Sequence, residues 1–181
     1  MVKPYYQDMY VTIYNCDCRD IIGSLVFDTI ITDPPYGINT PTTYKSDRRG
    51  VLTDCYNYPP VYDDDKPFNP SHLLQYNQIV LWGANYYADK LPTTGQWLVW
   101  DKRENIAVND GADCELAWCR GKKNNTPRIF YHMWNGMLKA SEKDQQRKHP
   151  TQKPIRLMKW CINQFNDTGI ILDHYMGSGP T

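Results

Sequence analysis

Two short segments at opposite ends of the chain contain the residues best suited to chemistry. In residues 33–36 a carboxylate and two prolines precede a tyrosine, so Asp33, the Pro34 carbonyl and the ring of Tyr36 follow one another closely. Proline fixes its own φ and keeps its predecessor extended, so this turn is rigid. In residues 173–179 an acid precedes glycines, which let a backbone approach a ligand closely. Hydrogen-bond acceptors beside a flat ring, together with a glycine turn, indicate a candidate active site.

Both segments follow a predicted buried strand. Residues 27–32 and 169–172 are short, largely apolar and β-branched, and they end immediately before Asp33 and Asp173. Open α/β sheets place their chemistry at the carboxyl ends of such strands, so we expect both acids at one sheet edge. A third polar segment, residues 149–154, lies shortly before the second strand. Either motif alone is typical of a simple turn, and their pairing at strand ends favours a functional site.

The rest of the chain alternates between short strands and helices. Further strands are predicted over residues 11–14, 79–82, 96–100 and 115–119, and helices over residues 19–25, 69–76 and 154–165. Residues 38–68 have no sustained period, and we expect a long loop there, of the kind that is usually functional or mobile. The alternation predicts one α/β domain over residues 1–181, with a mostly parallel sheet and helices on both faces.

The motifs and their order carry a family resemblance. The chain resembles the DNA amino-methyltransferases that use S-adenosylmethionine, and more narrowly the permuted group in which the catalytic motif precedes the cofactor motif. The resemblance runs through residues 14–17, 33–37, 79–86, 97–102, 114–118, 149–154 and 173–179. These segments cover nearly the whole chain in the order that the group shows. The resemblance implies a Rossmann-like methyltransferase fold that acts on double-stranded DNA.

The resemblance implies that residues 33–36 are catalytic, and the chemistry of an amino group explains their types. An exocyclic amine conjugated to a base ring is a poor nucleophile, which improves when acceptors hold its hydrogens. Asp33 and the Pro34 carbonyl supply these acceptors, Pro35 belongs to the rigid turn, and Tyr36 offers a face to a flipped-out base. Asp33 favours adenine N6 as the target, because cytosine-N4 enzymes of this group more often have serine or threonine there. Cytosine N4 remains the alternative.

The resemblance also implies S-adenosyl-L-methionine as the cofactor and assigns residues to it. Asp17 is expected near the adenine end, and Thr151 and Lys153 are expected near the methionine carboxylate. The glycine motif is expected to shape the methionine pocket through Asp173, Tyr175, Gly177, Ser178 and Gly179. His174 and Pro180 depart from the family pattern, in which proline and threonine are common at these positions.

The sequence ends at Thr181, shortly after the glycine motif. In the family this motif is followed by a helix, a strand and an acidic residue for the cofactor ribose. We therefore expect a fold that is incomplete at its carboxyl end, with weak cofactor binding and exposed sheet edges that would allow a homodimer. A truncated remnant that binds DNA without catalysis is a rival interpretation.

The distribution of charge agrees with a DNA partner. The formal net charge is zero, yet residues 121–159 contain ten basic side chains and only two acidic ones. Aromatic residues are interleaved with them, as expected where bases or sugars are contacted. We expect residues 121–148 to form a short DNA-recognition segment. The predicted DNA-binding residues are Lys45, Arg48, Arg49, Lys122, Lys123, Arg128, Arg147 and Lys148.

Composition and motifs argue against several other classes. The chain has no apolar run long enough to span a bilayer and no apolar amino-terminal stretch, so we expect a cytoplasmic protein without a membrane partner. None of the six cysteines is spaced like a zinc or redox pair, and no metal site is predicted. An RNA or protein-amide methyltransferase remains a rival interpretation, as does a proline-rich ligand at residues 59–62.

Overall fold

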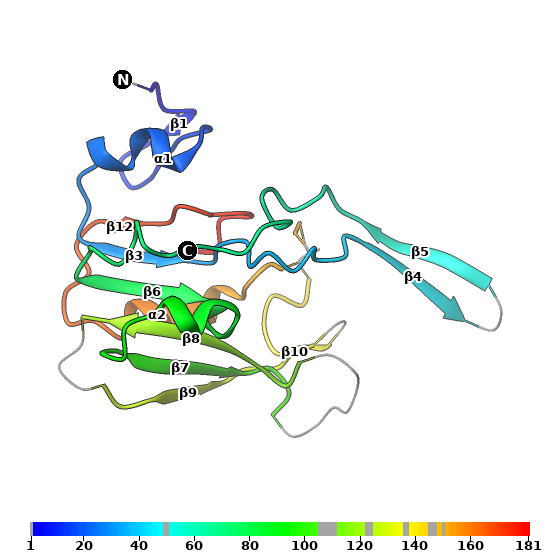
Figure 1. The fold of residues 1–181 in the computed structure, drawn as a ribbon. Coiled ribbons are helices and arrows are strands. Elements are labelled where there is room, and N and C mark those ends of the chain that lie inside the picture. Colours follow the sequence, from blue (N-terminus) through cyan, green and yellow to red (C-terminus); the bar gives the residue numbers. More distant parts are fainter. Residues whose placement is uncertain are drawn as a thin grey trace.

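The chain, described here by a computed structural model, is built around a six-stranded mixed sheet (Figure 1). The structure describes residues 2–48, 51–104, 112–121, 125–135, 138–144, 148–149 and 151–181, with the backbone alone at 44–48, 51–57 and 135. Across the sheet the strands follow the order β12 (Ile171–Leu172), β3 (Thr29–Thr32), β6 (Gln78–Trp82), β8 (Cys114–Arg120), β7 (Gln96–Asp101) and β9 (Arg128–Tyr131). All of them except β9 overlap a predicted strand.

The pairing of these strands brings three strand ends together. β3 is parallel to both β12 and β6, and β9 is parallel to β7, whereas β8 is antiparallel to β6 and β7. Parallel neighbours end on the same side of a sheet. Asp33, Gly83 and Asp173, which directly follow β3, β6 and β12, therefore lie at one edge. The predicted α/β fold with a mostly parallel sheet is confirmed.

The central strand β6 is buried on both faces of the sheet. Val80 and Trp82 pack with helix α2 (Ile155–Ile162) in one hydrophobic core. Ile79 and Leu81 point to the opposite core, which contains residues of the 3₁₀ helix η2 (Ala84–Lys90). A strand covered on both faces reads as a continuous apolar run, which explains why its position was predictable. Helices on both faces of the sheet are confirmed.

The predicted helices had different outcomes. The one at residues 19–25 is present as α1 (Cys18–Ile21) followed by η1 (Ile22–Ser24), and the one at residues 154–165 is α2. The helix predicted at residues 69–76 is wrong, because this segment forms successive turns. Its carbonyls at Leu74 and Tyr76 accept hydrogen bonds from the guanidinium of Arg120 on β8. These hydrogen bonds join the end of the segment to the central sheet.

Within the described residues, three small two-stranded sheets lie outside the central sheet. The predicted strand at residues 11–14 is β2 (Thr12–Ile13), which pairs with β1 (Tyr6–Gln7). The irregular loop predicted at residues 38–68 is wrong over its middle, where β4 (Thr43–Arg48) and β5 (Val51–Asn57) form a hairpin that projects from the body (Figure 1). Cross-strand pairing, which local periodicity does not reveal, forms this hairpin. The third sheet pairs β10 (Trp134–Asn135) with β11 (Leu138–Lys139).

None of the helices within the described ranges is long and apolar enough to cross a membrane. The same residues contain no group of three or more histidine, cysteine, aspartate or glutamate side chains placed to hold a metal ion.

Candidate active site

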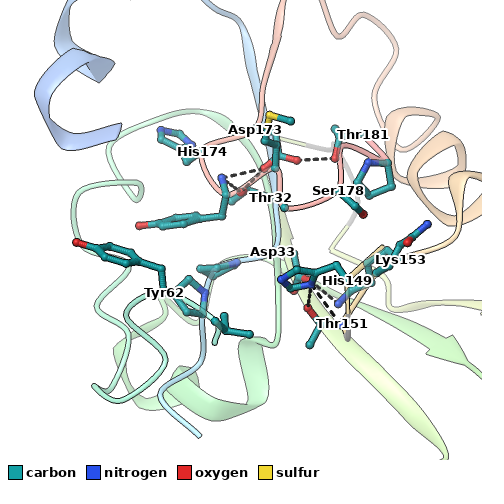
Figure 2. A pocket seen from close by; sticks show the side chains of 18 of the residues that line it. Thr32, Asp33, Tyr62, His149, Thr151, Lys153, Asp173, His174, Ser178 and Thr181 are labelled. Carbon is teal, nitrogen blue, oxygen red and sulfur yellow. Dashed lines mark hydrogen bonds and ion pairs between the residues drawn. The ribbon is translucent and has the colours of Figure 1, made fainter. Parts of the chain in front are cut away.

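A cavity of about 440 Å³ lies at the sheet edge where β3 and β12 end (Figure 2). Its lining includes Asp33 and Tyr36 from the first motif, Asp173 from the second, and Thr151 and Lys153 from the segment before α2. Pro34, Pro35, Tyr175, Gly177 and Ser178 line it as well, whereas Gly179 lies just outside the lining. Pockets of roughly 300–1,000 Å³ typically enclose small ligands. The fold thus joins the three predicted segments around one cavity.

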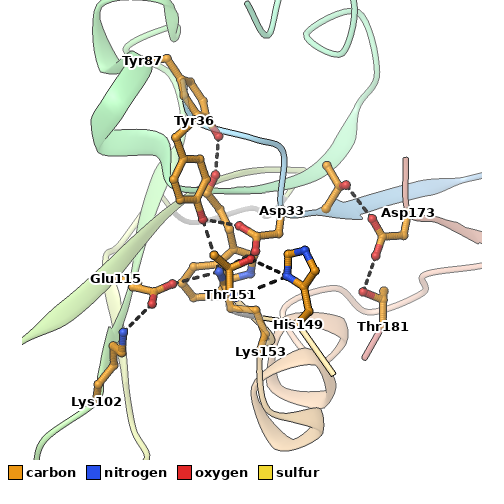
Figure 3. Close-up of polar contacts among 12 residues, drawn as sticks. Asp33, Tyr36, Tyr87, Lys102, Glu115, His149, Thr151, Lys153, Asp173 and Thr181 are labelled. Atoms are coloured by element: carbon orange, nitrogen blue, oxygen red, sulfur yellow. Dashed lines mark hydrogen bonds and ion pairs between the residues drawn. The ribbon is translucent and has the colours of Figure 1, made fainter. Parts of the chain in front are cut away.

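Both carboxylate oxygens of Asp33 have a partner (Figure 3). The Nζ of Lys153 donates to Oδ2 at 2.6 Å, and the hydroxyl of Tyr36 donates to Oδ1. The Asp33 side chain is nevertheless 19% exposed, so it still faces the cavity. Because an ionised carboxylate has about four lone-pair positions, Asp33 can accept a further hydrogen bond from a ligand.

The ring of Tyr36 contacts an aromatic side chain and a glycine. It stacks on Tyr86 with ring centroids 5.0 Å apart and an angle of 15° between the planes. The ring also contacts Gly83, where a Cβ atom would overlap the Tyr36 ring. Gly83 also has a φ of 68°, in the left-handed region that favours glycine. The end of β6 therefore fixes the position of the aromatic ring next to Asp33.

We expect Gly83→Ala to lower the free energy of unfolding by about 2–3 kcal/mol, because the methyl group both strains the backbone and displaces Tyr36. Thermal or urea unfolding of the purified chain measures this loss. The matched control is Gly23→Ala, since a Cβ there meets nothing within 4 Å and its φ is not in the left-handed region. Equal stability of the two variants would contradict the proposed packing of Tyr36.

Lys153 links Asp33 to a second carboxylate, Glu115 on β8. Its side chain is 4% exposed, and its Nζ lies 3.0 Å from Oε2 of Glu115. The other oxygen of Glu115 accepts from Lys102 at 2.7 Å. The sequence placed Lys153 near the carboxylate of a cofactor, whereas its ammonium here contacts Asp33 and Glu115. A direct contact between Lys153 and a cofactor stays a prediction.

Burial and charge act in opposite directions on these groups. Burial raises the pKa of Asp33, and the Lys153 ammonium opposes this rise without cancelling it. Burial also raises the pKa of Glu115, but Lys153 and Lys102 outweigh burial and leave that pKa at about 2. For Lys153, burial lowers the pKa, and the two carboxylates outweigh burial and raise it. Lys153 and Glu115 are therefore both charged at neutral pH.

Asp173 organises the glycine turn at the end of β12 (Figure 2). Its Oδ1 accepts from the hydroxyl of Thr32 at 2.6 Å, and its Oδ2 accepts from the hydroxyl of Thr181 at 2.6 Å. The backbone N–H of Tyr175 also donates to Oδ1, at 3.1 Å. Among the described side chains, the hydroxyl of Ser178 is buried without a hydrogen-bond partner. A buried, unpaired hydroxyl in a cavity wall is suited to a polar ligand.

Asp64 holds the backbone that follows the first motif. Its Oδ1 accepts from the N–H groups of Tyr36 and Gly37 at 3.0 and 2.9 Å, and from that of Ile38 at 3.3 Å. Its Oδ2 accepts from the N–H of Thr40 at 2.7 Å. Asp64 is only 4% exposed. This carboxylate fixes the exit of the chain from the catalytic motif, and it was not among the residues that the sequence indicated.

Asp17 lies beside a neighbouring cavity of about 420 Å³, which is lined by residues of α1, the 62–72 region and the second motif. The carboxylate of Asp17 caps α1 by accepting from the N–H of Arg19 at 2.9 Å, and it is also paired with the Arg19 guanidinium. These contacts lower the pKa of Asp17 to about 2. Both cavities share Tyr62 and His174 in their walls. Asp17 is therefore adjacent to the main cavity without lining it.

The predicted DNA-binding residues are only partly described. Arg128 on β9 and Lys148 have exposed side chains, which agrees with a surface role. The side chains of Lys45 and Arg48 fall outside the described parts of the chain, as do all atoms of Arg49, Lys122, Lys123 and Arg147. The DNA-binding role of this set stays a prediction.

Comparison with known proteins adds to this geometry. A family model described as DNA methylase matches residues 99–181. A curated relative, the type II methyltransferase M2.MboI of Moraxella bovis, is 23% identical, and the match covers 99% of this chain and 81% of the relative. Both matches support the predicted enzyme class, a DNA methyltransferase.

Two solved structures resemble this chain over 93% of its length. One is M1.HpyAVI in complex with SAM, with 24% identity, a TM-score of 0.45 and 84% of that chain covered. The other is M1.HpyAVI alone, with 20% identity, a TM-score of 0.44 and 82% of that chain covered.

Proposed function

We propose that the chain transfers a methyl group from S-adenosylmethionine to the exocyclic N6 amino group of a flipped-out adenine in double-stranded DNA. One observation carries this proposal: Asp33 and Tyr36, which follow β3, face the same cavity as the Asp173 glycine turn, which follows β12. Amino-group chemistry needs an acceptor beside a flat ring, and it needs the methyl donor within direct reach. In this chain the acceptor with its aromatic ring and the glycine turn proposed for the methyl donor lie at one sheet edge.

The residues around the glycine turn fit the cofactor. Asp173 holds the turn through Thr32 and Thr181, and the unpaired hydroxyl of Ser178 offers a donor or acceptor at the cavity wall. Gly177 lines the cavity and has a φ of 53°, in the left-handed region that favours glycine, so no side chain fills the space there. When bound, S-adenosylmethionine supplies an electrophilic methyl group on a sulfonium sulfur.

Three groups of the first motif act on the base. The carboxylate of Asp33 and the carbonyl of Pro34 accept the two hydrogens of the amine, which raises the electron density available on its nitrogen. Tyr36 provides a face on which the base can stack, and Tyr86, which stacks on Tyr36, keeps that ring in position. The proton that the amine releases can pass to a carboxylate oxygen of Asp33. The choice of adenine rests on Asp33, since the cytosine-N4 enzymes that the chain resembles more often have serine or threonine at this position.

We expect digestion of methylated DNA to release N6-methyladenine. The chain is incubated with S-adenosylmethionine and unmodified duplex DNA, and the nucleosides are separated and identified by mass spectrometry. N4-methylcytosine in place of N6-methyladenine would keep the enzyme class and overturn the choice of base. Absence of any methylated nucleoside, with cofactor binding measured by calorimetry as a separate readout, would overturn the proposed function of this chain.

A further inference from the structure

Four charged side chains form a continuous row into the cavity (Figure 3). Lys102 contacts Glu115 at 2.7 Å, Glu115 contacts Lys153 at 3.0 Å, and Lys153 contacts Asp33 at 2.6 Å. Positive and negative groups alternate, so the formal charges of the row cancel. Lys153 is the least exposed of the four, at 4%, whereas Lys102, Glu115 and Asp33 are 21%, 26% and 19% exposed. The row therefore links Lys102 and Glu115 to the proposed acceptor of the amine through one buried ammonium.

Lys153 divides its three donors among three acceptors. Besides Oδ2 of Asp33 and Oε2 of Glu115, its Nζ contacts the hydroxyl oxygen of Tyr36 at 3.3 Å. An ammonium group has three N–H bonds, so all of them are directed at side chains of the site. A change in the ion pair between Glu115 and Lys153 therefore changes the ion pair between Lys153 and Asp33.

We propose that Glu115 is a positioning residue: it shares the ammonium of Lys153 with Asp33 and so keeps the Asp33 carboxylate a strong acceptor for the substrate amine. This inference rests on the proposed function, because it assigns Glu115 to the same amino-group transfer. Glu115 does not face the base and acts only through Lys153.

The physical reason is the division of one positive charge between two carboxylates. A buried ammonium with one carboxylate forms a tight pair, and the electron pairs of that carboxylate are then less available to a second donor. The second carboxylate, Glu115, lies 3.0 Å from the ammonium and attracts it as well, which weakens the pair between Lys153 and Asp33. The electron pairs of Asp33 then stay available to the substrate amine. The effect on proton affinity is consistent, since the charge of Glu115 raises the pKa of Asp33 while Lys153 lowers it.

Other titratable groups also interact with Asp33, so their titration must be measured together with that of Asp33. They come from η2, from the segment before α2, from the first motif itself and from the end of β12. These groups are Tyr36, Tyr87, His149, Lys153 and Asp173.

Glu115→Gln tests the proposal because it removes the charge and keeps the shape. We expect kcat to fall about 10- to 100-fold, because Asp33 then accepts the amine hydrogens less strongly in the transition state. The KM for DNA and the Kd for S-adenosylmethionine should stay within about threefold, because Glu115 contacts neither ligand in the proposed arrangement. In a Lys153→Met background the same change should lower kcat by less than about twofold, since the residue through which Glu115 acts is then absent.

A second readout needs no catalysis. Carbon-13 NMR of labelled aspartate follows the titration of Asp33 in the unchanged chain and in Glu115→Gln, and we expect a lower Asp33 pKa in the variant. An Asp33 pKa that is unchanged or higher would overturn the role of Glu115, whether or not the chain methylates DNA. If the unchanged chain transfers no methyl group, the proposed function fails while this NMR comparison still decides the inference.

The control variant is Asp113→Asn, which removes a carboxylate paired with Arg103 at 3.0 Å just before β8, outside the row. Its kcat should stay within about twofold of the unchanged enzyme. Should Glu115→Gln not fold, Lys102→Met weakens the same row at its outer end, and we expect kcat to change about two- to fivefold with both ligand affinities retained. Unchanged kcat in either row variant, with an active parent enzyme, would overturn the proposal.

Discussion

Asp33→Ala is expected to lower kcat by about three orders of magnitude, which is within the range for loss of a group that acts on the reacting proton and charge. The carboxylate is proposed to hold the amine hydrogens during methyl transfer, so its loss removes stabilisation that develops in the transition state. kcat and kcat/KM should therefore fall together, while the Kd values for DNA and S-adenosylmethionine change by less than about threefold. Single-turnover methylation with tritiated cofactor measures the chemical step directly.

The variant should fold, because Lys153 keeps a partner when Asp33 is removed. Its Nζ still lies 3.0 Å from Glu115, so no unpaired ammonium is left in the interior. The matched control is Asp89→Ala, an exposed acid in η2, which should keep full activity. Retention of more than about a tenth of the parent kcat by Asp33→Ala would show that the Asp33 carboxylate is not the acceptor of the amine.

Lys153→Met is expected to destabilise the fold by about 3–5 kcal/mol at neutral pH, the usual cost of breaking a buried ion pair by removing one partner. The side chain of Lys153 is 4% exposed and lies between two carboxylates, Asp33 and Glu115. In the variant Glu115 keeps its pair with Lys102, whereas Asp33 loses its cation. For a chain of this length the loss corresponds to a melting temperature lower by about 10 °C. Differential scanning calorimetry measures it, and Lys159→Met, an exposed lysine of α2, is the control.

The destabilisation of Lys153→Met should shrink in acid. The pKa of Glu115 in the folded chain is lowered to about 2. The ionised Glu115 therefore contributes to the free energy of unfolding above its unfolded pKa, and this contribution is lost as pH falls towards 2. Lys153 remains protonated throughout this range, because its pKa is raised. Without Lys153, protonation of the Asp33 and Glu115 carboxylates relieves their repulsion in the variant. A difference in melting temperature that stays constant from pH 7 to pH 3 would contradict this pairing.

Local patterns were sufficient to predict most of the central sheet and helix α2. The strands β3 and β6 are covered on both faces, so their sequences are rich in β-branched and apolar residues, and α2 repeats buried residues at helical spacing. Prediction was wrong where distant partners decide the structure. The turns at residues 69–76 are bonded to Arg120 of β8 through two carbonyls, and the β4–β5 hairpin within residues 38–68 depends on pairing across two strands.

The sequence by itself determined which chemistry is available: an acid, a rigid proline turn and an aromatic ring after one strand, and an acid with glycines after another. Strand ends are readable from local composition, and parallel pairing then brings Asp33 and Asp173 to one edge. Only the tertiary structure decided what surrounds Asp33. Glu115 and Lys153 come from separate elements, and the strength of their pairing depends on distance and burial, which spacing along the chain does not encode.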